Sequence, residues 1–115
     1  MSTIATVLCQ VDDIEDGGAL ALKAELASGH ADLVAVRRGS DVWVYQNRCP
    51  HFSVGLDFTP GHFCTYRGQV LMCAHHSALF RFEDGLCIDG PCLGARLERI
   101  AIRVIDGIEV HLARH

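Results

Sequence analysis

The sequence predicts an all-β fold, an antiparallel β-sandwich, and two features of the chain support this prediction. Short runs of apolar and β-branched residues recur along the chain, separated at intervals of about 8 to 12 positions by turn residues such as Gly, Pro and Asp. Two of these separators, residues 38–41 (RGSD) and Asp106-Gly107, are typical of β-hairpins. Because short turns join antiparallel neighbours, we expect about eight to ten short antiparallel strands.

The N-terminal half contains three clear strand candidates and one ambiguous segment. Residues 4–9 (IATVLC) form a short apolar and β-branched run, and residues 33–37 and 42–46 are rich in Val and flank the first hairpin turn. Residues 19–28 are ambiguous, because their Ala, Leu, Lys and Glu content favours a helix that would stop at Gly29. Composition alone leaves this one segment undecided.

The C-terminal half is expected to consist of shorter strands. Turn residues interrupt its apolar stretches at 59–61, at 83–85 and at Gly90-Pro91. The hairpin signal at Asp106-Gly107 returns the chain antiparallel to the strand before it. The strands expected in this half are residues 62–66, 69–72, 79–82, 100–105 and 108–112.

Length and charge limit the classes to which the chain can belong. For 115 residues, of which 50% are hydrophobic, we expect a single domain spanning 1–115 with a buried core. The net charge of −4 argues against a nucleic-acid partner, because no basic excess compensates phosphate. No apolar run approaches the ~20 residues that span a bilayer, and the N-terminus has no basic segment followed by an apolar one. We therefore expect a cytoplasmic protein with no membrane partner.

Cysteine and histidine are paired at two places in the middle of the chain. The first pair, Cys49 and His51, has C-x-H spacing, and the second pair, Cys73 and His76, has C-x-x-H spacing. Residues 52–72 lie between the two pairs. Two thiolates and two imidazoles suit either a tetrahedral zinc ion or a two-iron cluster with both cysteines on one iron and both histidines on the other.

This combination of motifs resembles the Rieske [2Fe–2S] domain. The resemblance extends over most of the chain, from about residue 33 to residue 112, and the four-ligand pattern is highly specific. It favours an iron–sulfur cluster over zinc. The segments that carry it are 47–51 (NRCPH), Leu56-Asp57, 80–85 (FRFEDG), Gly90-Pro91 and 104–107 (VIDG).

The resemblance implies both a fold and a set of ligands. The fold is a β-sandwich with a small cluster-binding subdomain, at about residues 47–92, which is formed by two ligand loops. The cofactor is one Rieske-type [2Fe–2S] cluster per chain. Cys49 and Cys73 are expected to hold one iron, and His51 and His76 the other.

The function implied by the resemblance is that of a small Rieske ferredoxin. Such a protein takes one electron from a flavin- or iron-sulfur-containing reductase and passes it to a terminal oxygenase of the ring-hydroxylating or a related type. We expect a carrier and not an enzyme, because the chain offers no recognisable catalytic motif and no mononuclear iron domain follows the cluster domain. The alternatives are the small subunit of an assimilatory nitrite reductase, a redox-sensing or regulatory Rieske module, and a zinc-stabilised interaction domain.

The resemblance also implies a low reduction potential. High-potential members carry an extra Cys in each ligand loop, and Val54 and His75 stand at the corresponding positions here. Ser77 lies one position earlier than the Ser that bonds a cluster sulfur in those members, and Phe80 stands where they have a Tyr. Each difference removes polarisation that favours the reduced cluster. We therefore expect a potential near the lower end of the range of about −150 to +300 mV for Rieske centres.

The remaining cysteines are interpreted as small buried hydrophobic residues, because non-disulfide Cys is among the most buried residue types. His75 is expected to flank the cluster, and the other histidines outside the ligand set are assigned no role. The cysteines in question are Cys9, Cys64, Cys87 and Cys92.

Three further residues and one segment are assigned structural roles. Trp43 and Tyr45 alternate along a predicted strand and are expected in the core. Asp57 is expected to cap a turn and not to transfer protons. For the ambiguous segment, the resemblance favours a strand near residues 18–22, and we adopt it because helix propensity is a weak guide.

Overall fold

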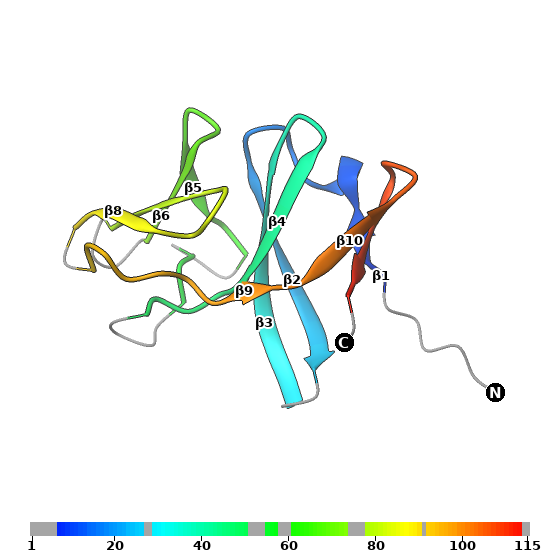
Figure 1. The fold of residues 1–115 in the computed structure, drawn as a ribbon, viewed down its shortest axis with the longest axis horizontal. Helices are drawn as coiled ribbons and strands as arrows, with labels where there is room; N and C mark the ends of the chain where they lie inside the picture. The colour runs from blue at the N-terminus through cyan, green and yellow to red at the C-terminus, as the bar shows by residue number, and fades with distance from the viewer. Residues whose placement is uncertain are drawn as a thin grey trace.

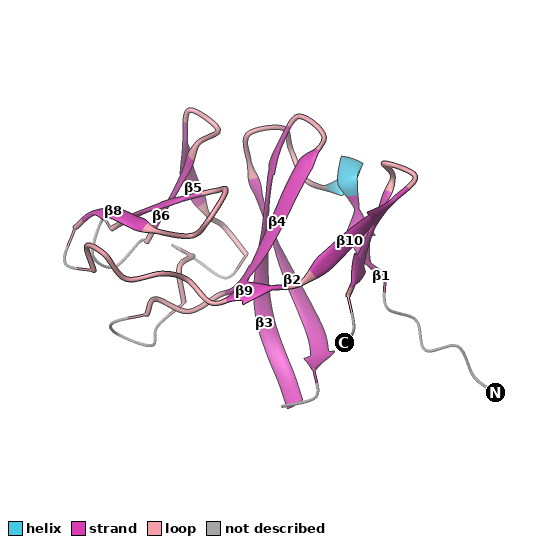
Figure 2. Cartoon of the chain, in the orientation of Figure 1, coloured by secondary structure: helices cyan, strands magenta, loops and turns pink. Residues whose placement is uncertain are grey.

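The computed structural model describes residues 7–26, 29–50, 55–57, 61–73, 78–90 and 92–113 of the chain. Within them, the chain forms antiparallel strands and one short 3-10 helix (Figure 1, Figure 2), which confirms the all-β prediction. The elements are β1 (Val7–Gln10), η1 (Val11–Asp13), β2 (Ala19–Leu26), β3 (Gly29–Arg38), β4 (Asp41–Gln46), β5 (Cys64–Tyr66), β6 (Val70–Met72), β7 (Leu79–Arg81), β8 (Cys87–Asp89), β9 (Arg99–Ile100), β10 (Ile102–Ile105) and β11 (Glu109–Leu112).

A four-stranded sheet of order β2-β3-β4-β9 forms the middle of the molecule (Figure 1). Four consecutive residues of β3, 33–36, are fully buried, which means that both faces of this strand are covered. Leu33 and Ala35 belong to one core cluster, and Val34 and Val36 belong to another. The uninterrupted apolar run is therefore explained by the central position of β3, since a strand covered on both faces does not alternate polar with apolar residues.

A three-stranded sheet of order β1-β11-β10 covers one face of the central sheet. Ile14, Val44 and Val110, all fully buried, lie in the core between them. The β10–β11 hairpin turns at Asp106 and Gly107, which have φ of 56° and 68°. Ile105 pairs with Glu109, so the loop consists of residues 106–108, and the Ile108 amide donates to the Ile105 carbonyl at 3.0 Å. The predicted turn at Asp106-Gly107 is therefore confirmed.

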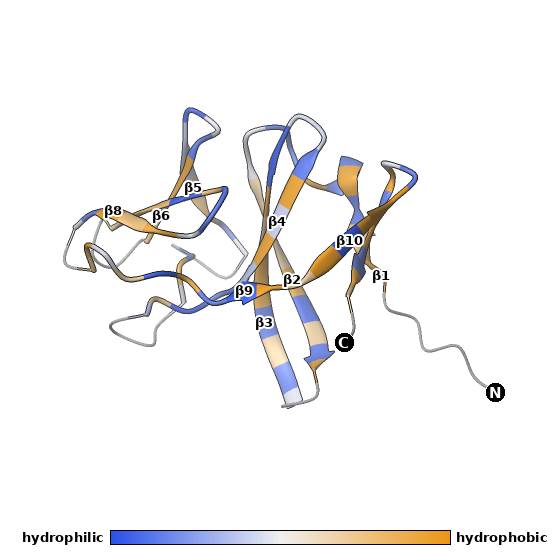
Figure 3. Ribbon diagram, in the orientation of Figure 1, coloured by the Kyte–Doolittle hydropathy of each residue, from blue (hydrophilic) through white to orange (hydrophobic). Residues whose placement is uncertain are grey.

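A second four-stranded sheet, of order β5-β6-β7-β8, lies on the other side of the central sheet (Figure 1). Its buried residues Leu71 and Phe80 share a core cluster with Tyr45 of β4, which is 1% exposed. The core position expected for Tyr45 is confirmed, and Trp43 is partly buried and packs against the same cluster. Figure 3 shows strongly hydrophobic segments along β4 that alternate with paler ones.

The ambiguous segment at 19–28 is a strand where the structure describes it. Ala19–Leu26 pairs with β3 along its whole length, from Ala19 opposite Val36 to Leu26 opposite Gly29. Leu20, Leu22 and Leu26 pack against the core cluster on the β1-β11-β10 side. Pairing and burial of this apolar face outweigh the helix propensity of the segment, and the strand runs four residues beyond the expected end at 22.

Two features of the C-terminal half differ from the prediction. The run expected as one strand at 100–105 is divided at Ala101, because Ile100 pairs with Val44 in the central sheet while Ile102 pairs with Leu112 in the three-stranded sheet. The chain thus passes from one sheet to the next within three residues. Strand β8 (Cys87–Asp89) was not predicted, and its turn-flanked sequence of three residues gives little local signal.

In the part of the chain that the structure describes, no helix has the length and apolar character needed to cross a bilayer.

Candidate functional site

The first predicted ligand loop leaves the end of β4 and is closed at its base by one side chain. The Asn47 side-chain oxygen accepts a hydrogen bond from the Leu56 amide at 2.7 Å, and its amide nitrogen donates to Asp57 Oδ1 at 3.2 Å. Asp57 Oδ2 accepts a bond from the Gly61 amide at 3.0 Å, which confirms its expected turn-capping role. Cys49 lies inside this closed loop and is fully buried.

The second predicted ligand loop joins β6 to β7, two strands that pair from Val70 to Met72. Its ends are held together by a hydrogen bond of 2.8 Å, which the Cys73 amide donates to the Ala78 carbonyl. Both residues are fully buried. The hairpin therefore fixes the position of Cys73 through its backbone.

The two ligand-candidate thiols share one core. Cys49 and Cys73 come from opposite ends of the motif and belong to the same cluster of buried residues, which also contains Cys92. Two buried thiols delivered by two closed loops fit the sulfur half of a Rieske ligand set. The predicted nitrogen ligands His51 and His76 lie outside the described residues, as do His75, Val54 and Ser77.

A third loop, which follows β8, contacts both ligand loops. Gly90 has φ of +102°, and a Cβ atom there would lie 2.7 Å from the Ala78 Cα in the second loop, so this contact requires glycine. Cys92 Sγ lies 3.4 Å from Cys49 Sγ in the first loop. Cys92 is buried, as predicted. Its contact with Cys49 was not predicted from the sequence. The one sequence feature that could have indicated it is the position of Cys92 directly after Gly90-Pro91.

The sheet that carries the second loop is anchored to the central sheet by a buried tyrosine. The Tyr45 hydroxyl donates a 2.5 Å hydrogen bond to the Phe82 carbonyl, just beyond β7. Burial raises the pKa of Tyr45 well above its ordinary value, which keeps this donor protonated. Thr65 of β5 adds a second tie, because its hydroxyl donates to the Gly17 carbonyl at 2.8 Å. These contacts hold the loop-bearing sheet in one orientation.

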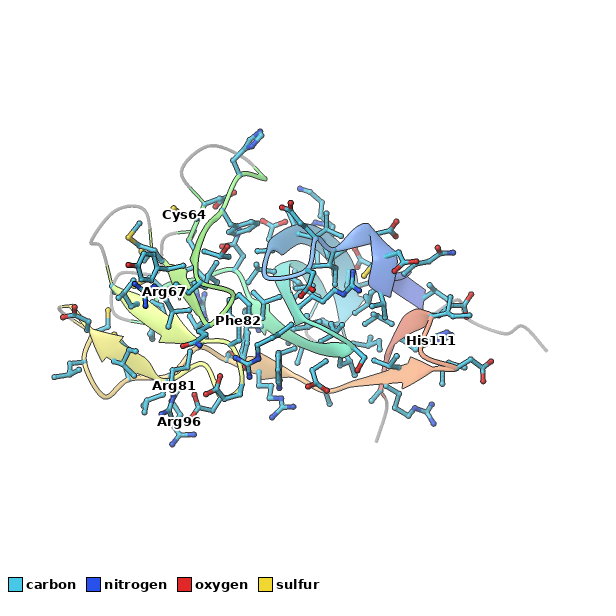
Figure 4. All side chains as sticks on the ribbon, turned by 90° about the horizontal axis from the view of Figure 1, so that it is seen from above. Cys64, Arg67, Arg81, Phe82, Arg96 and His111 are labelled. Carbon is cyan, nitrogen blue, oxygen red and sulfur yellow. The ribbon has the colours of Figure 1, made fainter. Side chains whose placement is uncertain are left out.

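The turn after β7 is organised by an ion pair at the surface. Arg81 Nε donates to Asp84 Oδ1 at 3.1 Å, and Asp84 Oδ1 also accepts the Leu86 amide at 3.0 Å. The hydrogen bond from Arg81 lowers the pKa of Asp84 below its ordinary value. Figure 4 shows Arg81 and Phe82 on the loop-bearing side of the molecule.

Two of the histidines outside the proposed ligand set pair with carboxylates. His30 pairs with Glu25 at 2.8 Å, and His111 of β11 lies 3.0 Å from Glu109. Cys9, Cys87 and Cys92 are buried as expected, but Cys64 is only half-buried, so the expectation was wrong for this residue. Figure 4 shows Cys64 and His111 far apart, on opposite sides of the view. No disulfide joins any of the six cysteines, all of which belong to the described part of the chain.

Comparison with known families gives one match that covers most of the chain. Residues 5–106 match the family described as "Rieske [2Fe-2S] domain". No sequence among the curated proteins matches the chain.

Solved structures share the fold at low sequence identity. The Sphingomonas yanoikuyae B1 ferredoxin is 23% identical with a TM-score of 0.73, and the match covers 96% of this chain and 100% of that one. The terminal oxygenase of carbazole 1,9a-dioxygenase from Novosphingobium sp. KA1 is 15% identical with a TM-score of 0.74, over 95% of this chain but 30% of that one. The complex of reduced oxygenase and oxidized ferredoxin in carbazole 1,9a-dioxygenase matches at 21% identity with a TM-score of 0.70, over 92% of this chain and 90% of that one.

Proposed function

The chain belongs to the Rieske [2Fe–2S] domain family, and from this membership we propose that it is a ferredoxin that carries single electrons to a terminal oxygenase. The observation that carries the proposal is the pair of buried thiols, Cys49 and Cys73, at the ends of two closed loops within the matched residues. A Rieske domain holds a Rieske-type [2Fe–2S] cluster, which takes up or releases one electron when it is bound.

The ligands we assign are Cys49 and Cys73 for one iron and His51 and His76 for the other. The sulfur half of this set is supported by the shared core cluster of the two cysteines. The histidine half is supported by the C-x-H and C-x-x-H spacings, which match the family motif. The subdomain that surrounds these ligands is assigned to about residues 47–92.

The proposed partners are a terminal oxygenase as electron acceptor and a flavin- or iron-sulfur-containing reductase as electron donor, all in the cytoplasm. Support for the acceptor comes from the fold shared with the ferredoxin in the oxygenase–ferredoxin complex of carbazole 1,9a-dioxygenase. Further support comes from the match to the whole length of the Sphingomonas yanoikuyae B1 ferredoxin.

The proposed reduction potential is low for a Rieske centre. Phe80 is fully buried beside the second loop and has no hydroxyl to donate toward the cluster. Val54 and His75 stand at the two positions where high-potential members carry the bridging cysteines, so this chain cannot form that disulfide. A redox titration followed by electron paramagnetic resonance (EPR) should give a midpoint below about 0 mV, near the lower end of the Rieske range. A midpoint well above zero would exclude a low-potential centre.

The ligand assignment is tested with the full chain, produced in iron-replete and oxygen-free conditions. The dithionite-reduced protein should give a Rieske EPR signal, and Cys73→Ser and His76→Ala should abolish it. Cys64→Ala and His75→Ala are the matched controls and should keep the signal. A colourless wild-type protein would overturn the cluster proposal, whereas loss of the signal in His75→Ala but not in His76→Ala would move the fourth ligand by one position.

The carrier role is tested separately by mixing the reduced protein with candidate acceptors in a stopped-flow spectrometer. Rapid reoxidation by a ring-hydroxylating oxygenase component, with product formed in the presence of substrate, is the expected result. Electron delivery to a sirohaem nitrite reductase instead would identify the protein as a subunit of that enzyme. A redox-dependent change in affinity for a partner, with no turnover, would identify a regulatory module.

A further inference from the structure

The third loop places a second sulfur against one of the proposed ligands. Cys92 Sγ lies 3.4 Å from Cys49 Sγ, although the two residues are 43 positions apart in the sequence. We propose that the Cys92 thiol donates a hydrogen bond to the ligand sulfur of Cys49 and thereby raises the reduction potential of the cluster. This inference rests on the proposed role of Cys49 as an iron ligand.

The contact between the two sulfurs is buried and shielded from water. Cys92 is 1% exposed, and Cys49 is fully buried in the same core cluster. A hydrogen bond in such surroundings is electrostatically stronger than one in water, because the effective dielectric constant is low. A weak thiol donor can therefore have a measurable effect here.

The direction of the hydrogen bond follows from the chemistry of ligation. A cysteine that binds iron does so as a thiolate and carries no proton, so Cys49 can act only as acceptor. Cys92 is not among the proposed iron ligands, so its S–H group can act as a donor. When Cys49 binds iron, Cys92 is therefore the donor between these two sulfurs.

The backbone around Cys92 holds its sulfur in place. The Cys92 carbonyl accepts the Ala95 amide at 2.8 Å, and the Ala95 carbonyl accepts the Cys87 amide at 2.8 Å. At the start of the loop, Gly90 packs directly on the backbone of Ala78 in the second ligand loop. The third loop is therefore closed at one end and docked at the other, which fixes the approach of Cys92 to Cys49.

The effect on the potential has a defined sign. Reduction adds negative charge to the cluster and its thiolates, and a donor that points at a ligand sulfur stabilises the more negative state. Removal of the Cys92 thiol should therefore lower the midpoint potential. This effect is compatible with the low overall potential that the sequence predicts. The comparison is between the wild-type chain and a variant that lacks the Cys92 thiol, and the wild type should have the higher potential of the two.

Cys87 provides a matched control from the same core. It is 1% exposed and belongs to the same cluster of buried residues as Cys92. Its thiol donates to the Asp89 carbonyl at 3.2 Å and has no contact of this kind with Cys49. Cys87→Ala thus removes a buried thiol of the same size and leaves the Cys92–Cys49 contact unchanged.

The experiment is a redox titration of the cluster-loaded full chain, wild type and variants, followed by EPR. Cys92→Ala should shift the midpoint to lower potential, Cys92→Ser should restore it to the wild-type value or above, and Cys87→Ala should leave it unchanged. Cys92→Val, which also lacks a donor, replaces Cys92→Ala if the smaller side chain prevents folding.

The inference is overturned if the variants without a donor keep the wild-type midpoint, or if Cys87→Ala shifts it equally. It is also overturned if some Cys92 variants fail to assemble the cluster and those that do assemble it all have the wild-type midpoint. Cys92 would then support assembly without affecting the potential. These results would leave the Rieske centre itself established. Absence of a Rieske signal in the wild-type protein would instead overturn the proposed function.

Discussion

The hydroxyl of Tyr45 is expected to stabilise the attachment of the loop-bearing sheet to the central sheet. Tyr45 is 1% exposed, and it donates a 2.5 Å hydrogen bond to the Phe82 carbonyl. Tyr45→Phe removes the donor, keeps the ring, and leaves a buried carbonyl without this partner. Loss of a buried hydrogen bond of this kind costs about 1–3 kcal/mol of the free energy of unfolding. For a chain of this size, each kcal/mol lowers the melting temperature by roughly 4 °C, so we expect a decrease of about 4–12 °C.

The assay is thermal unfolding of the cluster-loaded protein, recorded by far-ultraviolet circular dichroism at a fixed scan rate. Tyr66→Phe is the matched control, because Tyr66 is 58% exposed and a surface change of this kind costs less than about 0.5 kcal/mol. Hydrogen exchange adds a local readout, since the Gly85 amide, which bonds the Arg81 carbonyl at 2.9 Å, should exchange faster in Tyr45→Phe. The reasoning is refuted if Tyr45→Phe melts within about 1 °C of wild type, or if Tyr66→Phe is destabilised as much.

Two further changes test the third loop and the N-terminal core. Gly90→Ala would place a Cβ atom 2.7 Å from the Ala78 Cα, whereas Gly94→Ala, at a similarly positive φ, meets nothing within 4 Å. In both variants an alanine must adopt positive φ, which costs about 1–2 kcal/mol of stability. Only Gly90→Ala should also lower the iron content and the visible absorbance per chain. Equal iron content in the two variants would contradict this. Burial raises the pKa of the Cys9 thiol from 9.0 to about 11, so the folded state retains a proton that the unfolded state loses, and stability should fall as the pH rises from about 9 to 11. Denaturant unfolding across this range should show that the free energy of unfolding falls by about 1–2 kcal/mol in the wild type. This pH dependence should disappear in Cys9→Ala and persist in Cys64→Ala, which changes a half-buried position. An unchanged pH dependence in Cys9→Ala would refute this.

Local patterns predicted the strands whose sequences are clear apolar or β-branched runs bounded by turn residues. The β3–β4 hairpin, paired from Leu33–Gln46 to Arg38–Asp41, follows the Val-rich runs and the turn between them. The Asp106-Gly107 turn was predicted because the required left-handed backbone is a property of those two residue types. The four-ligand pattern is likewise a matter of residue type and spacing, and it stays a prediction for His51 and His76.

Where propensity and long-range packing disagreed, the packing determined the outcome. The segment Ala19–Leu26 has a helical composition, yet it is a strand because β3 offers it a partner and a core to cover. The division between β9 and β10 at Ala101 has no local signal, because it depends on which of two sheets each residue pairs with. Such outcomes depend on the pairing and burial that other strands provide, which the composition of one segment does not specify.

By itself, the sequence determined that this is an antiparallel β protein with a Cys–His ligand pattern, since strand alternation, turn type and ligand identity are properties of residues and their immediate neighbours. Only the tertiary structure decided that Tyr45 reaches Phe82, 37 positions away, and that Cys92 lies against Cys49. The physical reason is that these contacts exist only after three sheets have stacked and each loop has been closed by its own hydrogen bonds. The position of a loop residue over a ligand is therefore a consequence of the packed core beneath it.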